Sequence, residues 1–108
     1  MKIFISFDME GVAGIVDWAQ CGPPGQAYEE GRALLLGEVN AAIEGVFAAG
    51  ATEIVCNDSH GTMNNLNPAD LHGRAAYIAG RHKPSYTGAL FFLPLPPKHH
   101  SAGPGEKE

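Results

Sequence analysis

The chain has 108 residues, of which 44% are hydrophobic and 18% are charged, a composition typical of one globular domain rather than a disordered protein. Its formal net charge is −5 and its seven lysines and arginines are scattered, which argues against a nucleic-acid partner. No apolar run approaches the roughly 20 residues that cross a bilayer, and no signal-peptide pattern follows Met1, so we expect a cytoplasmic protein without a membrane partner.

The first predicted element is a strand over residues 2–7, because its nearly continuous apolar run is typical of a strand covered on both faces. Residues 11–25 hold four glycines and two prolines, which predicts a loop. A connection of this length inside a small domain is usually functional. Within it, the region of Trp18 either lines a pocket or covers the sheet edge.

A long helix is predicted over residues 26–49, since apolar side chains recur there at spacings of three and four: Leu35, Val39, Ala42, Ile43, Val46 and Phe47. Gly50 follows, where a left-handed helix cap favours glycine. A second strand over residues 53–56 then completes a strand–helix–strand unit. Such units are almost always right-handed, with their two strands parallel.

Further strands are predicted over residues 75–79 and 88–93. We interpret residues 1–93 as part of an α/β domain with a parallel-rich sheet built on a βαβ unit. Residues 94–108, which carry four of the eight prolines, are interpreted as an irregular tail rich in proline, glycine and histidine. An α/β sheet normally has helices on both faces, and the sequence shows one strong helix, so we interpret the domain as incomplete.

Polar side chains follow both strands of the βαβ unit. Asp8 and Glu10 point to the same side if the strand geometry continues, and two acids so close repel unless a cation lies between them. His60 follows the second strand, and the carboxyl ends of parallel strands meet at one edge of the sheet. Because carboxylate and imidazole ligands suit Zn²⁺ and related divalent ions, these three residues are a candidate metal site.

Each of these residues also has a structural interpretation, as a loop cap, a solvated acid or a hydrogen-bonded histidine. Asp58 either orients an imidazole or forms an Asx turn, and we favour the turn. Asn64 is a candidate for binding a substrate carbonyl, although asparagine is routine in loops. The residues alone do not choose between these alternatives.

Three segments together resemble a known enzyme family: SFDMEGVAG at 6–14, YEEGR at 28–32 and NDSHGTMNNL at 57–66. They resemble the zinc-dependent D-aminopeptidases of the bacterial dipeptide-transport-operon type, in that family's order and spacing. The resemblance implies an α/β fold, a ring-like homo-oligomer, and release of amino-terminal D-residues from short peptides. It also implies zinc, with two ions in the complete family site, while the ligand chemistry alone allows other divalent metals.

By motif position, the resemblance gives the zinc-bridging role to Asp8, and gives Glu10 and His60 roles as ligands of one ion. After residues 88–91 the sequence departs from the family, whose next segment carries another zinc ligand. His99 or His100, and of the two we favour His100, is the candidate for a displaced remnant of that segment, and a chance tail, for example from a reading-frame change, is at least an equal alternative. The resemblance places the family's catalytic histidine and final carboxylate ligand beyond residue 108.

We therefore expect a metal-dependent aminopeptidase lineage whose catalytic residues are unknown in this chain, and which alone is weakly active or inactive. The alternative is a non-catalytic metal-binding or interaction domain that retains half of a dimetal site.

Overall fold

A computed structural model of the chain describes residues 1–73, 75–80 and 91–94, the last four by their backbone alone. The elements in chain order are β1 (Lys2–Phe7), η1 (Trp18–Cys21), α1 (Gln26–Ala48), β2 (Glu53–Asp58), η2 (Pro68–Asp70), β3 (Ala76–Ile78) and β4 (Phe91–Pro94). The α/β class and the parallel-rich sheet on a βαβ unit are confirmed. No helix among the described residues combines the length and the apolar character that a bilayer crossing requires.

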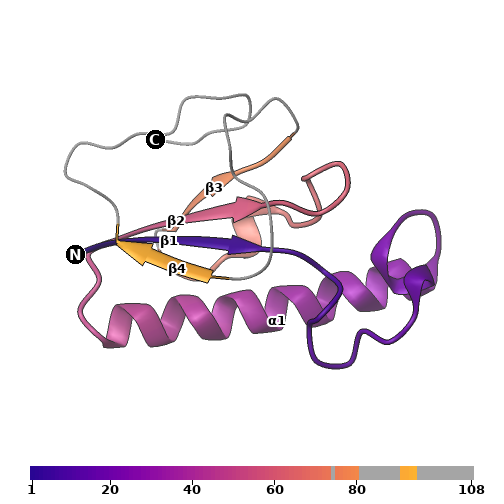
Figure 1. The fold of residues 1–108 in the computed structure, drawn as a ribbon, viewed down its shortest axis with the longest axis horizontal. Coiled ribbons are helices and arrows are strands. Elements are labelled where there is room, and N and C mark those ends of the chain that lie inside the picture. Colours follow the sequence, from indigo (N-terminus) through magenta and orange to yellow (C-terminus); the bar gives the residue numbers. More distant parts are fainter. Residues whose placement is uncertain (74, 81–90, 95–108) are drawn as a thin grey trace.

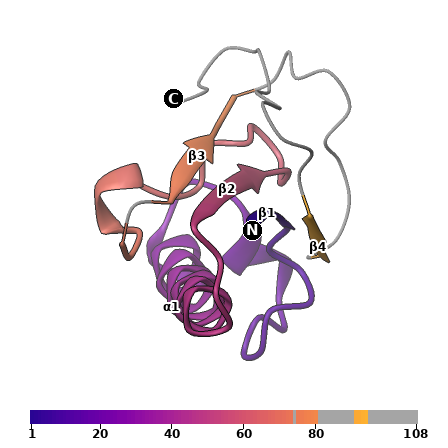
Figure 2. The same ribbon diagram turned by 90° about the vertical axis from the view of Figure 1, so that its left-hand side faces the viewer.

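The sheet has the strand order β3-β2-β1-β4. β1, β2 and β3 run parallel, and β4 pairs antiparallel with β1 (Figure 1). The helix α1 lies along one face of this sheet, as the end-on view shows (Figure 2). Because α1 returns the chain from the end of β1 to the start of β2, it starts at the carboxyl-end side of both strands, and its first turns extend past those ends.

Several predicted boundaries were wrong. β2 does not end at Cys56 but continues through Asp58, which pairs in register with Phe7. Its last two side chains are polar, and pattern reading assigned them to a loop, but both are buried. The predicted loop over 11–25 contains the short helix η1, and the predicted helix ends one residue early, at Ala48.

The two later strands also differ from prediction. β3 is shorter than residues 75–79. Pro94, which we placed in the tail, is the last residue of β4, an edge position where a missing backbone N–H is tolerated. Residues 88–90 of the predicted fourth strand and residues 95–108 of the predicted tail lie outside the described residues.

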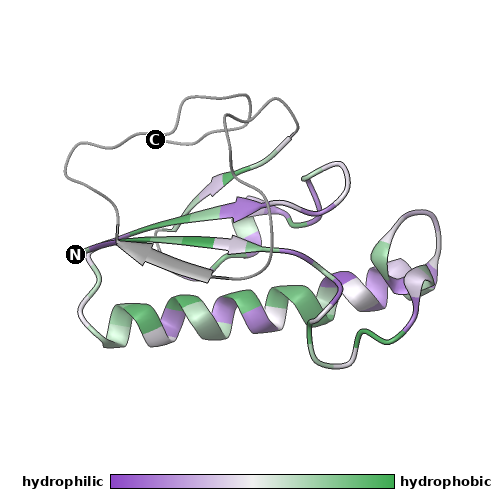
Figure 3. Ribbon diagram, viewed as in Figure 1, coloured by the Kyte–Doolittle hydropathy of each residue, from purple (hydrophilic) through white to green (hydrophobic). Residues whose placement is uncertain are grey.

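The core lies between α1 and the sheet, where the helix buries Leu35, Val39 and Ile43 against strand residues such as Ile5 and Ile54. Figure 3 shows apolar stretches on β1 and β2, and apolar and polar residues interspersed along α1. Each fully buried aliphatic side chain contributes about 1.5–3 kcal/mol. This packing holds the carboxyl ends of β1 and β2 side by side, and the next residues of the chain carry the candidate site.

Candidate metal centre

Asp8, Glu10 and His60 converge at the carboxyl edge of the sheet. His60 Nδ1 lies 2.6 Å from Asp8 Oδ1 and 2.8 Å from Glu10 Oε1. One ligand atom from each of the three residues lies within 4.8 Å of the other two. The fold therefore brings together three side chains from segments about fifty positions apart.

Local chain geometry directs the two acids outward. Met9 is fully buried, so its neighbours on either side, Asp8 and Glu10, project away from the core. A turn follows at once, in which the Val12 amide donates to the Met9 carbonyl at 3.1 Å. The Met9 amide also donates to Asp8 Oδ1 at 2.8 Å, which fixes one end of that carboxylate.

His60 is held from both sides. Beyond β2, the Ser59 amide and hydroxyl both donate to the Phe7 carbonyl, at 3.0 and 2.6 Å, and so tie the His60 loop to the end of β1. On the ring, Nε2 lies 2.5 Å from the backbone carbonyl oxygen of Cys21. A carbonyl accepts hydrogen bonds only, so Nε2 carries the ring proton and Nδ1 faces the two acids.

The electrostatics of the three residues indicate that a positive charge belongs among them. Partial burial, then the hydrogen bond with Glu10, raises the pKa of Asp8, and the same hydrogen bond lowers the pKa of Glu10. Burial by itself would lower the pKa of His60, but the Cys21 carbonyl and the two carboxylates outweigh it and raise that pKa. Without a metal ion, two neighbouring acids lie against an imidazole whose pKa is raised.

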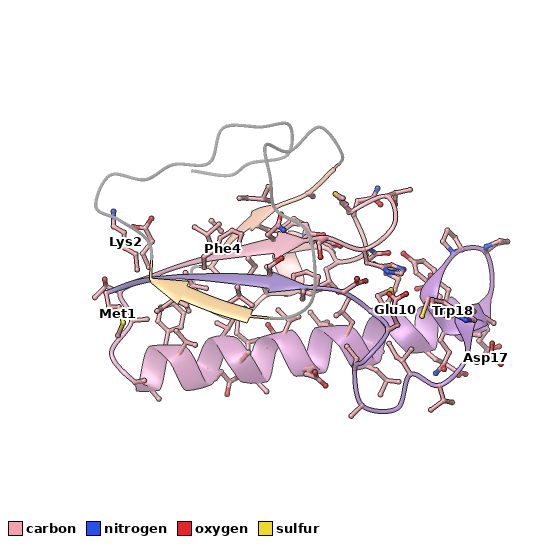
Figure 4. The ribbon with its side chains drawn as sticks, in the orientation of Figure 1. Met1, Lys2, Phe4, Glu10, Asp17 and Trp18 are labelled. Atoms are coloured by element: carbon pink, nitrogen blue, oxygen red, sulfur yellow. The ribbon has the colours of Figure 1, made fainter. Side chains whose placement is uncertain are left out.

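Lys2, the basic residue nearest to these acids in sequence, does not neutralise them. It lies at the other end of β1 and pairs with Glu53 at 3.4 Å, far from Glu10 (Figure 4). Two carboxylates and one imidazole, with their ligand atoms this close, suit a single Zn²⁺ after small side-chain rotations, since zinc bonds to such ligands are about 2.0–2.2 Å long. Metal ligation by these residues remains a prediction.

Asp58 has a different environment. It is fully buried and accepts hydrogen bonds from the His60 amide at 3.1 Å, the Asn65 amide at 2.6 Å, the Asn65 side chain at 3.0 Å and the Tyr77 hydroxyl at 2.8 Å. The first of these bonds is the predicted Asx turn, which is confirmed. The others make Asp58 the anchor of the whole loop that carries His60.

Asn65, which the sequence pattern does not single out, supports His60 more directly than its neighbour Asn64. Its side chain donates to the His60 carbonyl at 2.8 Å and accepts from the Tyr28 hydroxyl at 2.6 Å, and its own carbonyl accepts from Arg32 Nε at 2.6 Å. Tyr28 and Arg32 lie one turn apart on α1, beside its apolar stripe. Two polar groups at this spacing are the sequence signal that could have indicated a contact between this face of α1 and the His60 loop.

The remaining predicted site residues are not part of the cluster. Asn64 is exposed and its side chain accepts from the Thr62 hydroxyl, so substrate binding by Asn64 stays a prediction. His100 lies outside the described residues.

A pocket of about 410 Å³ opens beside Glu10, one of the three clustered residues. It is lined by Glu10, Ile15, Val16, Asp17, Trp18 and Cys21. Trp18, which is 74% exposed, therefore lines a pocket, and Figure 4 shows it at the same end of the molecule as Glu10. The site thus combines three metal-type ligands with an adjoining space that has both apolar and acidic walls.

Comparison with known proteins points to one family. A family profile described as D-aminopeptidase matches residues 1–89. The D-aminopeptidase of Bacillus subtilis (strain 168) is 39% identical in an alignment 100 positions long, which covers 84% of this chain and 36% of that protein. A solved structure, the Zn-dependent D-aminopeptidase DppA from Bacillus subtilis, described as a self-compartmentalizing protease, matches with a TM-score of 0.76 at 40% identity and covers 81% of this chain and 32% of its own. The chain thus spans about a third of the length of these relatives.

Proposed function

The chain belongs to the D-aminopeptidase family, and from that membership we propose that it forms part of a zinc-dependent aminopeptidase, which releases amino-terminal residues, D-residues in particular, from short peptides. The observation that carries the proposal is the convergence of Asp8, Glu10 and His60 within 4.8 Å at the carboxyl edge of the sheet. A zinc requirement agrees with that of the solved relative, a Zn-dependent D-aminopeptidase.

In this proposal the imidazole of His60 and the carboxylates of Asp8 and Glu10 would hold one zinc ion. The ion supplies a Lewis acid that can polarise a peptide carbonyl. Asp8 has a second carboxylate oxygen with which to share a second ion, the bridging role that the family resemblance assigns to it. Within the part of the chain that the structure describes, these residues form the one cluster of three or more metal-type side chains.

The pocket beside Glu10 is the proposed place for the amino-terminal residue of the peptide. Ile15, Val16 and Trp18 supply apolar surface for a side chain, and Glu10 stands at the wall next to the metal ligands. Trp18 is the sole tryptophan of the chain, so its fluorescence reports directly on this pocket. A D-alanyl dipeptide added to the zinc-loaded chain is expected to change the Trp18 emission saturably.

Zinc binding is the first test. Isothermal titration of the metal-free chain should give a tight site that is lost in Asp8→Asn and in His60→Ala. Glu30→Gln is the matched control, because it also neutralises an acid but lies on the exposed face of α1. A wild-type chain that is folded and binds no zinc would refute the proposal.

The second candidate function is a non-catalytic metal-binding or interaction domain that retains half of a dimetal site. Two observations favour it. The described residues bring three metal-type side chains together, and the chain spans about a third of the length of its relatives. The chain assayed alone does not separate the two candidates, because on either of them we expect little or no turnover of D-alanyl dipeptides with added zinc.

A chimera separates them. Residues 1–89 of this chain replace the matching segment of the Bacillus subtilis D-aminopeptidase, with a His60→Ala version as the control. Chelator-sensitive peptidase activity in the chimera, absent from the control, supports the aminopeptidase. A folded chimera that binds zinc but hydrolyses nothing supports the second candidate.

We extend the proposal to a cytoplasmic homo-oligomer. The two free cysteines of the described region are both buried, in keeping with a reducing compartment, and the solved relative is described as self-compartmentalizing. Light scattering on the purified chain, and on the chimera beside its parent enzyme, measures the assembly directly.

A further inference from the structure

The orientation of the His60 ring depends on a backbone atom of a distant segment. The Cys21 carbonyl lies 2.5 Å from His60 Nε2, although 39 positions separate the two residues. Because this carbonyl can only accept, it keeps the proton on Nε2 and leaves the Nδ1 lone pair as the group available to a metal ion. Whatever fixes the position of Cys21 therefore selects the metal-binding atom of His60.

Cys21 is the last residue of η1, and η1 is a stiff unit. Gln20 Oε1 accepts from the amides of Val16 and Asp17 at 2.7 and 2.9 Å, and Gln20 Nε2 donates to the Gly14 carbonyl at 3.1 Å. Asp17 caps the turn by accepting from the Ala19 amide at 2.8 Å. Because Cys21 follows Gln20 directly at the end of this hydrogen-bonded turn, we expect a displacement of the Gln20 backbone to move the carbonyl of Cys21 as well.

Gly31 sets how closely this turn approaches α1. A Cβ atom placed on Gly31 would lie 2.0 Å from the Gln20 carbonyl oxygen and 3.0 Å from its carbonyl carbon. Ordinary contact requires 3.4–4 Å, and the atoms in the way belong to the backbone. Any larger residue at position 31 would thus drive η1 away from the helix by more than about 1 Å, which takes the Cys21 carbonyl out of hydrogen-bond range of His60.

The same stretch of α1 also holds the other side of His60. Tyr28 and Arg32 flank Gly31 and bond to Asn65, whose side chain donates to the His60 carbonyl at 2.8 Å. One helical turn therefore controls the backbone of His60 through Asn65 and the ring of His60 through η1. This gives the YEEGR segment a physical role at a site to which it contributes no ligand.

We propose that Gly31 is a positioning residue of the metal centre: it seats η1 against α1 so that the Cys21 carbonyl holds His60 Nε2 and presents Nδ1 to the zinc ion. The inference rests on the proposed zinc site. It concerns the choice of coordinating atom, which the proposed function leaves open.

The test compares Gly31→Ala with Gly37→Ala in the full chain. Both substitutions place the same methyl group on α1, but a Cβ at Gly37 meets nothing within 4 Å. Zinc affinity, measured by titration, should fall about 10- to 100-fold in Gly31→Ala, as it does when partners behind a metal-bound histidine are lost. In Gly37→Ala it should stay within about twofold of the wild type.

A second readout reports the ring itself. Long-range ¹H–¹⁵N spectra of the histidine rings, with His60 assigned by its loss in His60→Ala, should show zinc on Nδ1 and a proton on Nε2 in the wild type. Gly31→Ala should show a mixed or reversed pattern. The wild-type spectrum by itself shows which ring nitrogen of His60 binds zinc. The inference can therefore still be overturned if Gly31→Ala does not fold.

The outcomes are distinct. Zinc on Nε2 of the wild-type His60 ring overturns the inference. An unchanged zinc affinity and an unchanged ring pattern in a folded Gly31→Ala chain also overturn it. In both cases the proposed zinc site itself still stands. A wild-type chain that binds no zinc overturns the proposed function. In that event the spectrum of the metal-free chain still decides whether the Cys21 carbonyl holds the Nε2 proton.

Discussion

Asp58 and Asp8 leave neighbouring parallel strands at the same edge of the sheet, yet their surroundings differ sharply. Asp58 ends β2, is fully buried, and accepts hydrogen bonds from the His60 and Asn65 amides and the Tyr77 hydroxyl. The Asp8 side chain is 30% exposed, and its Oδ1 lies 2.6 Å from the imidazole that also contacts Glu10.

These surroundings distinguish a structural acid, Asp58, from a candidate metal ligand, Asp8. Neutral N–H and O–H donors surround the carboxylate of Asp58, so its charge is already solvated by the protein and holds a loop in place. Asp8 faces a second acid, which costs free energy in the absence of a cation, and burial raises its pKa. An acid that faces a second acid is the one that a metal ion would stabilise.

The largest expected effect is on folding, at Asp58. Asp58→Ala would leave the Asn65 amide and the Tyr77 hydroxyl buried without their acceptor, so we expect a loss of about 3–5 kcal/mol in the free energy of unfolding. Urea denaturation followed by circular dichroism measures it, with the exposed Asp70→Ala as the control. A loss below about 1 kcal/mol would mean that the Asp58 network is not structural.

Asp8→Asn should show the opposite behaviour. We expect zinc affinity to drop by more than about 100-fold, equivalent to about 2.7 kcal/mol, because a ligand is lost. The unfolding free energy of the metal-free chain should change by less than about 1 kcal/mol, since the substitution also removes the repulsion with Glu10. Thermal denaturation with and without zinc checks both. If the metal-free Asp8→Asn chain unfolds as readily as Asp58→Ala, the two acids do not differ in their contribution to stability.

Tyr77→Phe tests the Asp58 network more finely, because it removes one hydrogen-bond donor and leaves the Asp58 carboxylate in place. Its hydroxyl donates to Asp58 Oδ2 at 2.8 Å and accepts from the Leu66 amide at 3.3 Å, while the ring stays packed against Phe7. We expect a cost of about 2 kcal/mol in stability, the usual range for a hydrogen bond to a charged group. Zinc affinity, measured on the folded variant, should change by less than about threefold. A larger drop in affinity would show that Asp58 acts on the ligands themselves.

The smallest effect is expected at Asn64. Its side chain is exposed and bonds to the Thr62 hydroxyl, so Asn64→Ala should alter the unfolding free energy by less than about 0.5 kcal/mol. Zinc affinity should not change. In the chimera, any effect should appear in KM for a D-alanyl dipeptide, the parameter that a substrate contact would move. Unchanged kinetics would remove Asn64 from the substrate site.

Much of the arrangement could be predicted from local patterns. Apolar runs and a helical stripe identified β1, α1 and β2, and the parallel connection then placed Asp8, Glu10 and His60 at one edge of the sheet. The end of β2 was missed because pattern reading takes Asn57 and Asp58 as loop residues, whereas their polar groups are buried in the sheet. Asn65 was missed because its partners lie on α1, 33 and 37 positions away.

Which side chains come together follows from the order of residues along the chain, because the carboxyl ends of parallel strands in one βαβ unit must lie together and the polar residues follow those ends directly. How these side chains are oriented depends on packing between distant segments. The ring nitrogen of His60 that faces the acids depends on a backbone carbonyl in η1, and the position of η1 depends on the missing side chain of Gly31. No sequence pattern reveals the role of a backbone carbonyl or of a missing side chain. Both act through the distance at which the helix α1 packs against the turn η1.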